Sequence, residues 1–577
     1  MKQSCNSGGR LGAFWRISLL LLLVLMAVFR MTPASAETKA FRIGILQEPR
    51  TLNVWLASDA WSSRVLSQMY EPLYIREPQD LKLVPWLAAA DPVYDAATLS
   101  YTVPLRHAKW SDGSPLTAAD VAFTGRLIQT FRIPRYISSW DFIEEIEALD
   151  PHTVRFVLKA PRAIFTSRTL TTPIVQKKRW APVLEQLASQ QDSMLRLLNH
   201  EVTDPVSSGP FVLKQWKKGA FLYLKKNPHF FANGKEISGY RLGPHIPGII
   251  FKVYGTTDAA VLALKKGTID FFWWGLQPGY LADLDQDCNV RVFSSQKSAL
   301  YYVGLNLRRA PFDDIHFRQA LATVIDKEFI IKRILHDYAV KMDSVVPPSN
   351  TFWYCPDVRR YGEGLGRDER IRRAYRILQE GGYSWEVPPV NGKGEVVTGE
   401  GIKMPDGREM RGITILTPPA DYDPHRAMIG IMIQEWVKML GMDAVSRPMP
   451  LGAMIHHVKT RHEFDCFVLG YGSLSLDPDY LRNFFISTNS KPKGWNTSGY
   501  HNPEFDRIAE ASARTLDREK RRQLIWAMQK MVMEDLPWIP LYCPKLEEGA
   551  RAGRFQGWIN MVGGIGNKWS FCRIRPQ

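Results

Sequence analysis

Short apolar runs alternate with segments of helical spacing along most of the chain. Residues 41–46 form an apolar run that ends at Glu48-Pro49, which predicts a strand followed by a turn. Residues 62–69 have helical spacing, whereas residues 99–105 alternate between apolar and polar positions as a strand does. The alternation predicts a mixed α/β protein with several lobes.

Turn and cap residues mark the ends of several predicted elements. Thr117 is a candidate N-cap of a helix that starts at the next residue, and Gly219 lies between two apolar runs as in a hairpin. Residues 426–440 form an amphipathic segment that ends at Gly441, a residue typical of helix C-caps. Residues 386–411 are rich in glycine, proline and charge, which predicts an exposed insertion or hairpin.

The first 36 residues have the pattern of an export signal. A basic start without acidic residues is followed by an apolar run at residues 17–29 and by small residues at 34–36. A transmembrane helix needs about 20 apolar residues, so an uncleaved anchor is the less favoured alternative. No cysteine follows the run closely, which argues against a lipid anchor. We therefore expect a signal peptide at residues 1–36 and a mature chain that is soluble in the periplasm.

Export changes the meaning of the net charge. The chain has 74 Lys and Arg against 58 Asp and Glu, a formal charge of +16. Four of the basic residues lie in residues 1–36, so 16 minus 4 leaves +12 on the mature chain. Basic groups such as Lys520-Arg521-Arg522 have acidic neighbours and follow a helical pattern, and we interpret this one as a solvated face. We expect no nucleic acid as a partner.

The cysteines predict neither a disulfide scaffold nor a redox motif. Five remain after residue 36, at positions 288, 355, 466, 543 and 572, and no two have CxxC spacing. An odd number leaves at least one free thiol, while one or two bridges stay open as alternatives.

The search for catalytic or metal-binding motifs yields little. The chain has no GxSxG, GxxxxGK[ST] or HExxH sequence. His456, His457 and His462 lie close together, but Lys459 and Arg461 between them would repel a cation. A solvated basic segment is the favoured interpretation. We expect no catalytic residue, metal or cofactor.

Several separate blocks of sequence carry a family resemblance. The most specific block is residues 105–121, Leu-Arg-His-Ala-Lys-Trp-Ser-Asp-Gly-Ser-Pro-Leu-Thr-Ala-Ala-Asp-Val. The other blocks follow in the same order as in the family and lie at residues 48–53, 69–73, 207–211, 263–270, 311–327, 500–506 and 534–542. Together they resemble the extracellular solute-binding proteins of family 5, which serve peptide, dipeptide and nickel ABC importers, over nearly the whole mature chain.

The resemblance implies an α/β, two-lobed periplasmic-binding-protein fold of type II, in its large three-domain form. Lobe 1 is expected to be discontinuous, and lobe 2 to be one segment, with a hinge and a ligand cleft between them. The expected divisions are 37–85 for the first part of lobe 1, 86–205 for an inserted domain, 206–297 for its second part, 298–537 for lobe 2, and 538–577 for the C-terminal part of lobe 1.

The function implied by the resemblance is transport rather than catalysis. Such a protein captures a peptide or peptide-like solute between its lobes and delivers it to the permease subunits of an ABC importer, and we expect a monomer. A receptor of the same fold for an opine, a sugar conjugate or a metal complex is the first alternative. An exported enzyme or a periplasmic chaperone is the second.

The same resemblance indicates where the cleft walls lie. They are the loop after the first strand, the segment after Asp270 and the second-lobe strand at residues 467–473. Family members often carry an aromatic residue after the glycine of this strand, and Tyr471 matches it. Tyr471, Gly472 and Ser473 are therefore candidate ligand-binding residues.

One position departs from the family pattern. Leu474 stands where an aspartate often pairs with the amino terminus of a bound peptide. Asp477 could replace that aspartate if the loop is re-routed, or Asp477-Pro478 could be a structural turn, which we favour slightly. The departure motivates a solute modified at its amino end, or a solute that is not a peptide.

Aromatic residues supply the remaining candidates. Trp273 and Trp274 are neighbours on an expected strand and face opposite sides, so at most one is expected to line the cleft. Trp55 and Asp59 lie in the loop after the first strand, and packing in the core is an equal alternative for Trp55.

Overall fold

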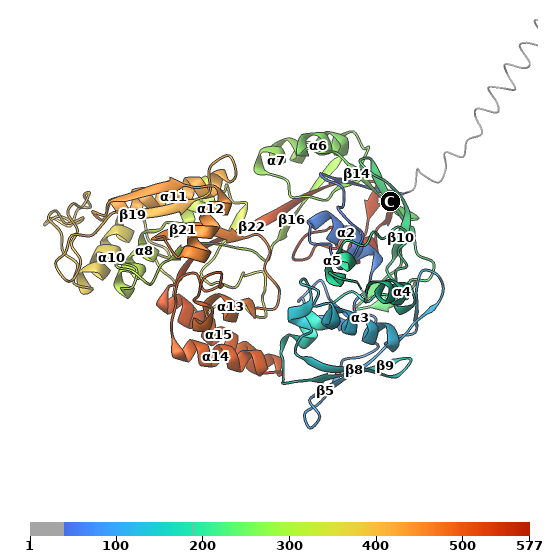
Figure 1. Ribbon diagram of the computed structural model, residues 1–577. Helices are drawn as coiled ribbons and strands as arrows, with labels where there is room; N and C mark the ends of the chain where they lie inside the picture. The colour runs from blue at the N-terminus through green and yellow to red at the C-terminus, as the bar shows by residue number, and fades with distance from the viewer. Residues whose placement is uncertain (1–39, 189) are drawn as a thin grey trace, which may run out of the picture.

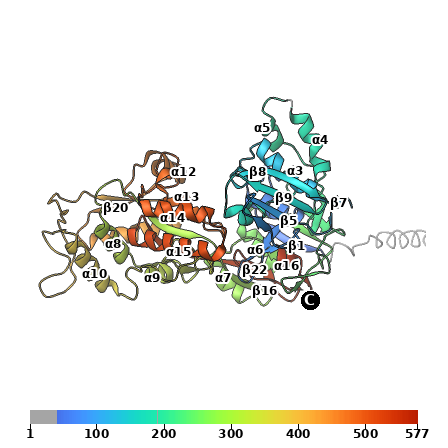
Figure 2. The same ribbon diagram turned by 90° about the horizontal axis from the view of Figure 1, so that it is seen from below.

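Two α/β lobes, joined by two crossings of the chain, make up residues 40–188 and 190–577, the part that this computed structural model describes (Figure 1). We call lobe 1 the body that contains β1 to β16 and the end of the chain, and lobe 2 the body that contains β17 to β21. Figure 2 separates the lobes, with α8 and α10 in lobe 2 on one side and α3 and α6 in lobe 1 on the other. The signal peptide expected at residues 1–36 lies outside the described residues.

One sheet of 12 strands runs through both lobes of the described chain. Its order is β10-β11-β14-β1-β15 in lobe 1, then β22, then β17-β21-β19-β20 in lobe 2, and β16 and β18 also pair with β22. The strands are β1 (Phe41–Ile45), β10 (Phe211–Lys217), β11 (Phe221–Lys226), β14 (Gly248–Val253), β15 (Phe271–Phe272), β16 (Val290–Gln296), β17 (Leu300–Leu305), β18 (Ala339–Lys341), β19 (Ile413–Thr417), β20 (Ala444–Pro448), β21 (Cys466–Tyr471) and β22 (Trp538–Arg551).

Strand direction decides which edges of the lobes face each other. β1 is parallel to β14 and β15, and β19 is parallel to β20 and β21. The antiparallel partner of Phe272 is Gly549 on β22, and that of Tyr471 is Leu300 at the start of β17. The carboxyl ends of the parallel strands in each lobe therefore meet at the chain crossings.

Helices cover both faces of the lobe 1 half of the sheet. Phe272 packs into a cluster with α6 (Thr257–Lys265) and α7 (Pro278–Asp285). Phe271 packs on the opposite face with α2 (Ala60–Met69) and α16 (Lys568–Phe571). This alternation follows from the two-residue period of a strand.

A smaller antiparallel sheet, β4-β5-β9-β8, lies within the inserted part of lobe 1. The inserted part contains β4 (Val93–Asp95), β5 (Ser100–Pro104), β8 (Ile143–Asp150), β9 (Thr153–Leu158), α3 (Ala118–Thr130), α4 (Lys177–Ala188) and α5 (Ser193–Leu198). The helix start predicted at Thr117 is confirmed, because Thr117 is the N-cap of α3 and its backbone N–H donates to Asp120 at 2.9 Å.

Lobe 2 has a separate core on each face of its sheet. Val303 and Ile415 pack with α8, α10 and α11, whereas Tyr302 and Leu416 pack with α13, α14 and α15. The helices are α8 (Ile315–Val324), α10 (Arg367–Glu380), α11 (Pro424–Lys438), α12 (Leu451–His456), α13 (Tyr480–Phe485), α14 (Pro503–Arg514) and α15 (Arg518–Asp535).

Two hairpins form where glycine-containing sequence predicts turns. The hairpin at Gly219 is confirmed by the antiparallel pair β10–β11. Residues 384–403 form a second hairpin, with antiparallel bridges from Val387 to Glu400 and from Val390 to Val396. All five cysteines of the described chain are free, so the open alternative of one or two bridges is not realised there.

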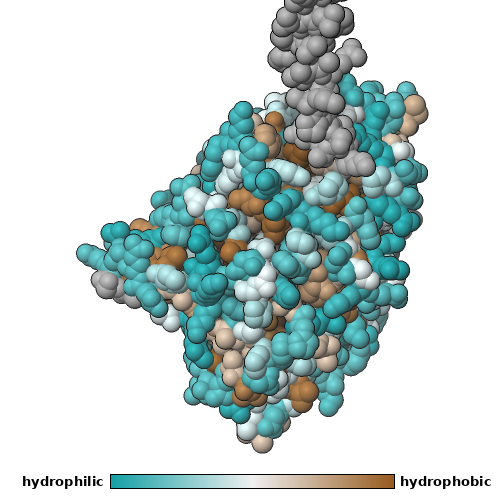
Figure 3. Space-filling view, turned by 90° about the vertical axis from the view of Figure 1, so that its right-hand side faces the viewer, coloured by the Kyte–Doolittle hydropathy of each residue, from teal (hydrophilic) through white to brown (hydrophobic). Residues whose placement is uncertain are grey.

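One face of lobe 1 is mainly hydrophilic. Figure 3, which views the side of the molecule on the right of Figure 1, shows hydrophobic residues only in small separate patches on that face. Within the described ranges, no helix has the length and apolar character needed to cross a membrane.

Candidate functional site

The loops that follow the parallel strands face one another between the lobes. In lobe 1 these are residues 46–59 after β1 and 273–277 after β15. In lobe 2 they are residues 418–423 after β19 and 472–479 after β21. In open α/β sheets, ligands bind outside the carboxyl ends of the strands. The space between the lobes is therefore the candidate site.

A hollow of about 550 Å³ lies beside the chain crossings and has residues of both lobes in its wall. Lobe 1 contributes residues 275–279, lobe 2 contributes Tyr422, and Lys297 lies on the connection between β16 and β17. Tyr301 and Tyr542 stack in the wall, with ring centres 4.7 Å apart and planes 12° apart. Ligand pockets of drug-sized molecules have this order of volume.

The guanidinium of Arg64, on α2, lies against three tryptophan rings. Its central carbon is 4.8 Å from the ring centre of Trp61, 5.1 Å from that of Trp273 and 5.2 Å from that of Trp274. Nη1 donates a hydrogen bond to the carbonyl of Trp273. In the described chain, Nε and Nη2 have no hydrogen-bond partner and are not sealed from solvent. Arg64 therefore keeps donors available to a ligand.

Lys297 and Glu548 complete a group of three charges at the crossings. Glu548, on β22, is 1% exposed and accepts a hydrogen bond from the backbone N–H of Ile565 at 2.6 Å. The charges of Arg64 and Lys297 act on Glu548 and on each other. Even so, neither cation has a carboxylate oxygen within 4.0 Å anywhere in the described chain. We call Arg64, Lys297 and Glu548 the hinge charges.

Burial is the main influence on the protonation of all three hinge charges. It lowers the pKa of Arg64 to about 10, against the opposing attraction of Glu548. It raises the pKa of Glu548 to about 7, against the Ile565 N–H and the charge of Arg64. It also lowers the pKa of Lys297. Each group lies in an environment that disfavours its own charge.

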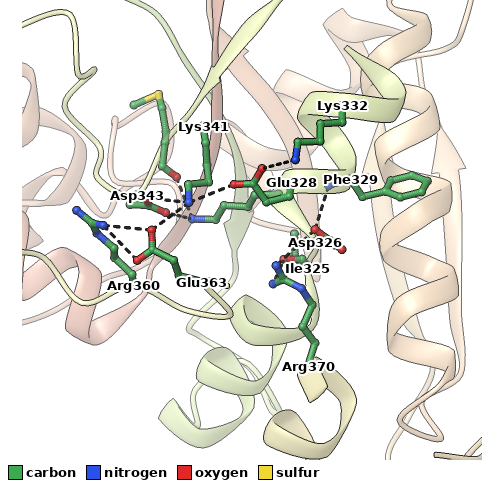
Figure 4. Close-up of polar contacts among 12 residues, drawn as sticks. Ile325, Asp326, Glu328, Phe329, Lys332, Lys341, Asp343, Arg360, Glu363 and Arg370 are labelled. Atoms are coloured by element: carbon green, nitrogen blue, oxygen red, sulfur yellow. Dashed lines mark hydrogen bonds and ion pairs between the residues drawn. The ribbon is translucent and has the colours of Figure 1, made fainter. Parts of the chain in front are cut away.

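Lobe 2 holds a buried lysine in a different way, beside the ion pairs of Lys341, Asp343 and Glu363 that Figure 4 shows. Nζ of Lys327 lies 3.1 Å from a carboxylate oxygen of Asp343 and donates to the carbonyl of Met342 at 2.9 Å. Lys341 contacts Asp343 at 3.8 Å and Glu363 at 3.2 Å. Every charged side chain in this paired network, which also includes Asp326, Glu328, Lys332, Arg360 and Arg370, has an oppositely charged partner.

The two adjacent tryptophans differ in burial, but the expectation that they face opposite sides of a strand is wrong. β15 ends at Phe272, and both rings lie against the Arg64 guanidinium. Trp273 is 4% exposed and packs edge-on against Phe571, with ring centres 4.9 Å apart. Trp274 is 37% exposed and lies over Trp61 at 5.1 Å. Trp274 is thus the one of the pair that a solute between the lobes could touch, while Trp273 belongs to the core.

Trp55 and Asp59 have structural contacts in lobe 1. Trp55 is 2% exposed and packs edge-on against Tyr136 and Trp180, at 6.1 and 5.7 Å. The carboxylate of Asp59 accepts a hydrogen bond from the Ser62 N–H at 2.8 Å and caps α2. Trp55 therefore packs in the core against the inserted part of lobe 1, and Asp59 fixes the start of α2.

The end of β21 presents open backbone beside the first chain crossing, where Tyr471 pairs with Leu300. Tyr471 stacks on Phe484, with ring centres 4.7 Å apart. Gly472 and Ser473 are exposed, and outside the β17–β21 ladder their backbone groups make no hydrogen bond in the described chain. A Cβ added at Gly472 would meet nothing within 4 Å. Leu474 is 8% exposed and its N–H donates to the Ser298 carbonyl at 2.6 Å, so its side chain packs inward.

Asp477 joins the two lobes away from the crossings. Its carboxylate accepts two hydrogen bonds from Arg521, at 2.7 and 2.8 Å, and one from the Ser167 hydroxyl of lobe 1 at 2.7 Å. Burial opposes its ionisation, but Arg521 and Ser167 hold the pKa of Asp477 at about 2. The expectation that Lys520-Arg521-Arg522 is wholly solvated is wrong at Arg521, which is 3% exposed because this ion pair draws it inward.

Sequence reasoning did not identify the hinge charges. Arg64 interrupts a helical run, and Glu548 stands within the long apolar C-terminal strand, so both are charges at positions whose neighbours are buried. That signal was available, but Lys297 had none, since its role depends on the chain crossing.

Among the described residues, no group of three His, Cys, Asp or Glu side chains is placed to hold a metal ion.

Comparisons with known proteins agree with this architecture. The family model for bacterial extracellular solute-binding proteins, family 5 (middle region), matches residues 82–493. The oligopeptide-binding protein AppA of Bacillus subtilis (strain 168) is 25% identical over 511 residues, which cover 87% of this chain and 86% of AppA. The glutathione-binding protein GsiB of Salmonella choleraesuis (strain SC-B67) is 23% identical, covering 86% of this chain and 87% of GsiB. The solved structure of AppA from Bacillus subtilis with a nonapeptide has a TM-score of 0.64 at 23% identity, covering 93% of this chain and 99% of that one, and shows the same fold.

Proposed function

Because the chain belongs to the bacterial extracellular solute-binding proteins of family 5, we propose that it is the solute-binding component of an ABC importer. It captures a peptide or peptide-like solute between its lobes in the periplasm and delivers it to a membrane permease. Two relatives support this class of solute, since one is described as oligopeptide-binding and another as glutathione-binding. An export signal at residues 1–36 belongs to the same proposal.

The main support for a peptide as the solute is the open side of β21. β19 pairs with β21 only at Cys466 and Phe467, so the side of β21 away from β17 has no neighbouring strand beyond Phe467. The exposed backbone of Gly472 and Ser473 continues that open side. An extended peptide can add to such an edge through main-chain hydrogen bonds, which do not depend on its side chains.

Two aromatic residues supply the proposed side-chain contacts. Tyr471 is the last residue of β21 in lobe 2, and Trp274 in lobe 1 is 37% exposed. The chain crosses between the lobes at residues 296–300 and again along β22, and bending there brings the two walls together. A solute that contacts both walls stabilises the closed arrangement, since it interacts more strongly with that arrangement than with an open one.

The test is a direct search for a bound peptide. Protein purified from periplasm without unfolding should carry peptide at one molecule per chain, measured by native mass spectrometry. Random pentapeptide pools should raise the unfolding temperature of ligand-free protein, because a ligand at 100 times its Kd adds about 2.7 kcal/mol of stability. Absence of both effects would show that the solute is not a peptide, and turnover of the peptides would favour an enzyme.

A pair of glycine variants tests the place of binding. Gly472→Val places a branched side chain in the open space beside β21, and we expect at least tenfold weaker peptide binding with unchanged thermal stability. The matched control is Gly452→Val on α12, where an added Cβ also meets nothing within 4 Å. Equal affinity of the two variants would remove Gly472 from the site.

A further inference from the structure

Two cations beside the chain crossings are not neutralised by the protein itself, and one of them, Lys297, lines the hollow between the lobes. Arg64 and Lys297 are half-buried, and neither has a carboxylate within 4.0 Å among residues 40–188 and 190–577. The ammonium of Lys297 makes no hydrogen bond in this part of the chain and is not sealed from solvent. A desolvated charge without a partner is costly, so such positions usually have a counter-ion.

We propose that the cleft binds a carboxylate of the solute between the guanidinium of Arg64 and the ammonium of Lys297, beside the exposed face of Trp274. This inference rests on the proposed function, because it names the chemistry of the solute that the same cleft accepts. The two cations come from different segments, α2 of lobe 1 and the first chain crossing. A carboxylate held by both would therefore also link lobe 1 to the hinge.

The contacts of the tryptophan rings indicate that the ligand group bound here is an anion and not a cation. The Arg64 guanidinium already lies over Trp61, Trp273 and Trp274, so those faces do not await a cation from the solute. The free Nε and Nη2 of Arg64 are the two donors that can hold both oxygens of one carboxylate in parallel hydrogen bonds. In a site that excludes water, this attraction is much stronger than at an exposed surface.

Glu548 does not replace such a ligand. Its carboxylate is 1% exposed and is engaged by the backbone N–H of Ile565. With a pKa of about 7, it is only half ionised near neutral pH. The hinge charges consequently keep a positive balance, which attracts an anion into the cleft.

Three pentapeptide pools with free amino termini and uncharged backbones test the proposal. The first pool has uncharged side chains and a carboxylate terminus, the second has the same side chains and an amide terminus, and the third has the amide terminus and one glutamate. Apparent affinities come from thermal shift as a function of pool concentration. We expect the second pool to bind about 30-fold more weakly than the better of the other two, as expected for loss of one desolvated charge contact.

The pools also separate the two sources of the carboxylate. Tight binding of the first pool alone identifies the terminal carboxylate, and tight binding of the third alone identifies a side-chain carboxylate, and either result supports the proposal. Equal or tighter binding of the second pool overturns the proposal while the proposed peptide function stands. Failure of all three pools to bind overturns the proposed function and this inference together.

Variants then assign the carboxylate to these side chains. Arg64→Gln and Lys297→Gln should each weaken binding of the preferred pool about 30-fold and bring it close to the amide pool. Arg64→Lys keeps the charge and should retain part of the preference. Arg291→Gln is the control, because that exposed guanidinium also lies on an aromatic ring, 4.5 Å from Phe293, but outside the cleft. If Arg64→Gln does not fold, the comparison of pools on the unaltered protein still decides the proposal.

Discussion

The paired network of lobe 2 and the hinge charges both take charges out of water, but they stabilise them differently. Lys327 is buried together with Asp343, and their nitrogen and oxygen lie 3.1 Å apart. Arg64 and Lys297 are desolvated next to Glu548, yet no carboxylate lies within 4.0 Å of either in the described chain. In lobe 2 the protein supplies both partners, whereas at the hinge one partner is missing.

The difference indicates which charges serve the fold and which serve binding. A buried pair holds its segments in register and loses stability if one member is removed. A cation left without a partner beside a cleft lowers stability in the free protein and gains a partner when an anion binds. The two regions should consequently respond in opposite ways when a charge is removed.

The largest effect is expected in the paired network. Asp343→Asn leaves the buried Lys327 without its counter-ion, and we expect the free energy of unfolding to fall by about 4 kcal/mol. Urea unfolding at neutral pH measures this change. Peptide affinity should not change, since the network lies in lobe 2 outside the hollow at the hinge.

The control for this prediction is an exposed ion pair. Asp406→Asn removes one member of the Asp406–Arg408 pair on the surface of lobe 2 and should leave the unfolding midpoint unchanged. A loss of stability for Asp343→Asn no greater than that for Asp406→Asn would end the distinction between the two regions.

The second effect is expected at Glu548 and has the opposite sign. Burial raises the pKa of Glu548 from its usual 4.5 to about 7, so the folded protein binds the proton more tightly than the unfolded chain does. The stabilisation from this proton is complete below pH 4.5 and is lost as the pH rises through 7. Glu548→Gln mimics the protonated form and should raise stability at pH 8 by on the order of 3 kcal/mol, with no gain at pH 4.

Thermal unfolding between pH 4 and pH 8 measures the difference between the two proteins. The groups that face Glu548 are Arg64 on α2, Lys297 at the first crossing and the backbone N–H groups of Ile565 and Gly566. Glu236→Gln, on an exposed glutamate of a short hairpin, is the control and should leave the pH profile unaltered. A Glu548→Gln profile parallel to that of the unaltered protein would show that Glu548 is not held protonated by the fold.

Much of the fold could be predicted from the sequence because its signals are local. The helix start at Thr117 and the hairpin at Gly219 follow from cap and turn chemistry within a few residues. The period of a strand does not carry over to Trp273 and Trp274, because β15 ends at Phe272 and both rings turn toward Arg64. The family resemblance supplied the two-lobed fold, which no local pattern contains.

The site was harder to predict because its residues come together only in the folded chain. Arg64, Lys297 and Glu548 are far apart in sequence, and although Arg64 and Glu548 stand within apolar segments, nothing local shows that the three charges meet. Local pattern also suggested that Arg521 is solvated, whereas it is buried by Asp477 from 44 positions away. Charges that meet across a chain crossing leave no periodic signal, so only the folded structure shows that they act as one group.

The smallest effect is expected where the two kinds of charge overlap. Asp477 is paired inside lobe 2 with Arg521, as Lys327 is with Asp343, but it also accepts a hydrogen bond from Ser167 of lobe 1 at 2.7 Å. Ser167→Ala removes only the contact between lobes, so we expect a loss of at most about 1 kcal/mol in unfolding free energy. The fraction of molecules with the lobes apart should rise, because one contact that favours their approach is gone. Small-angle scattering of the ligand-free protein measures this as a larger radius of gyration, and Ser473→Ala, whose hydroxyl makes no such contact, is the control. An unchanged radius with a large loss of stability would instead place Ser167 with the paired charges that hold the fold.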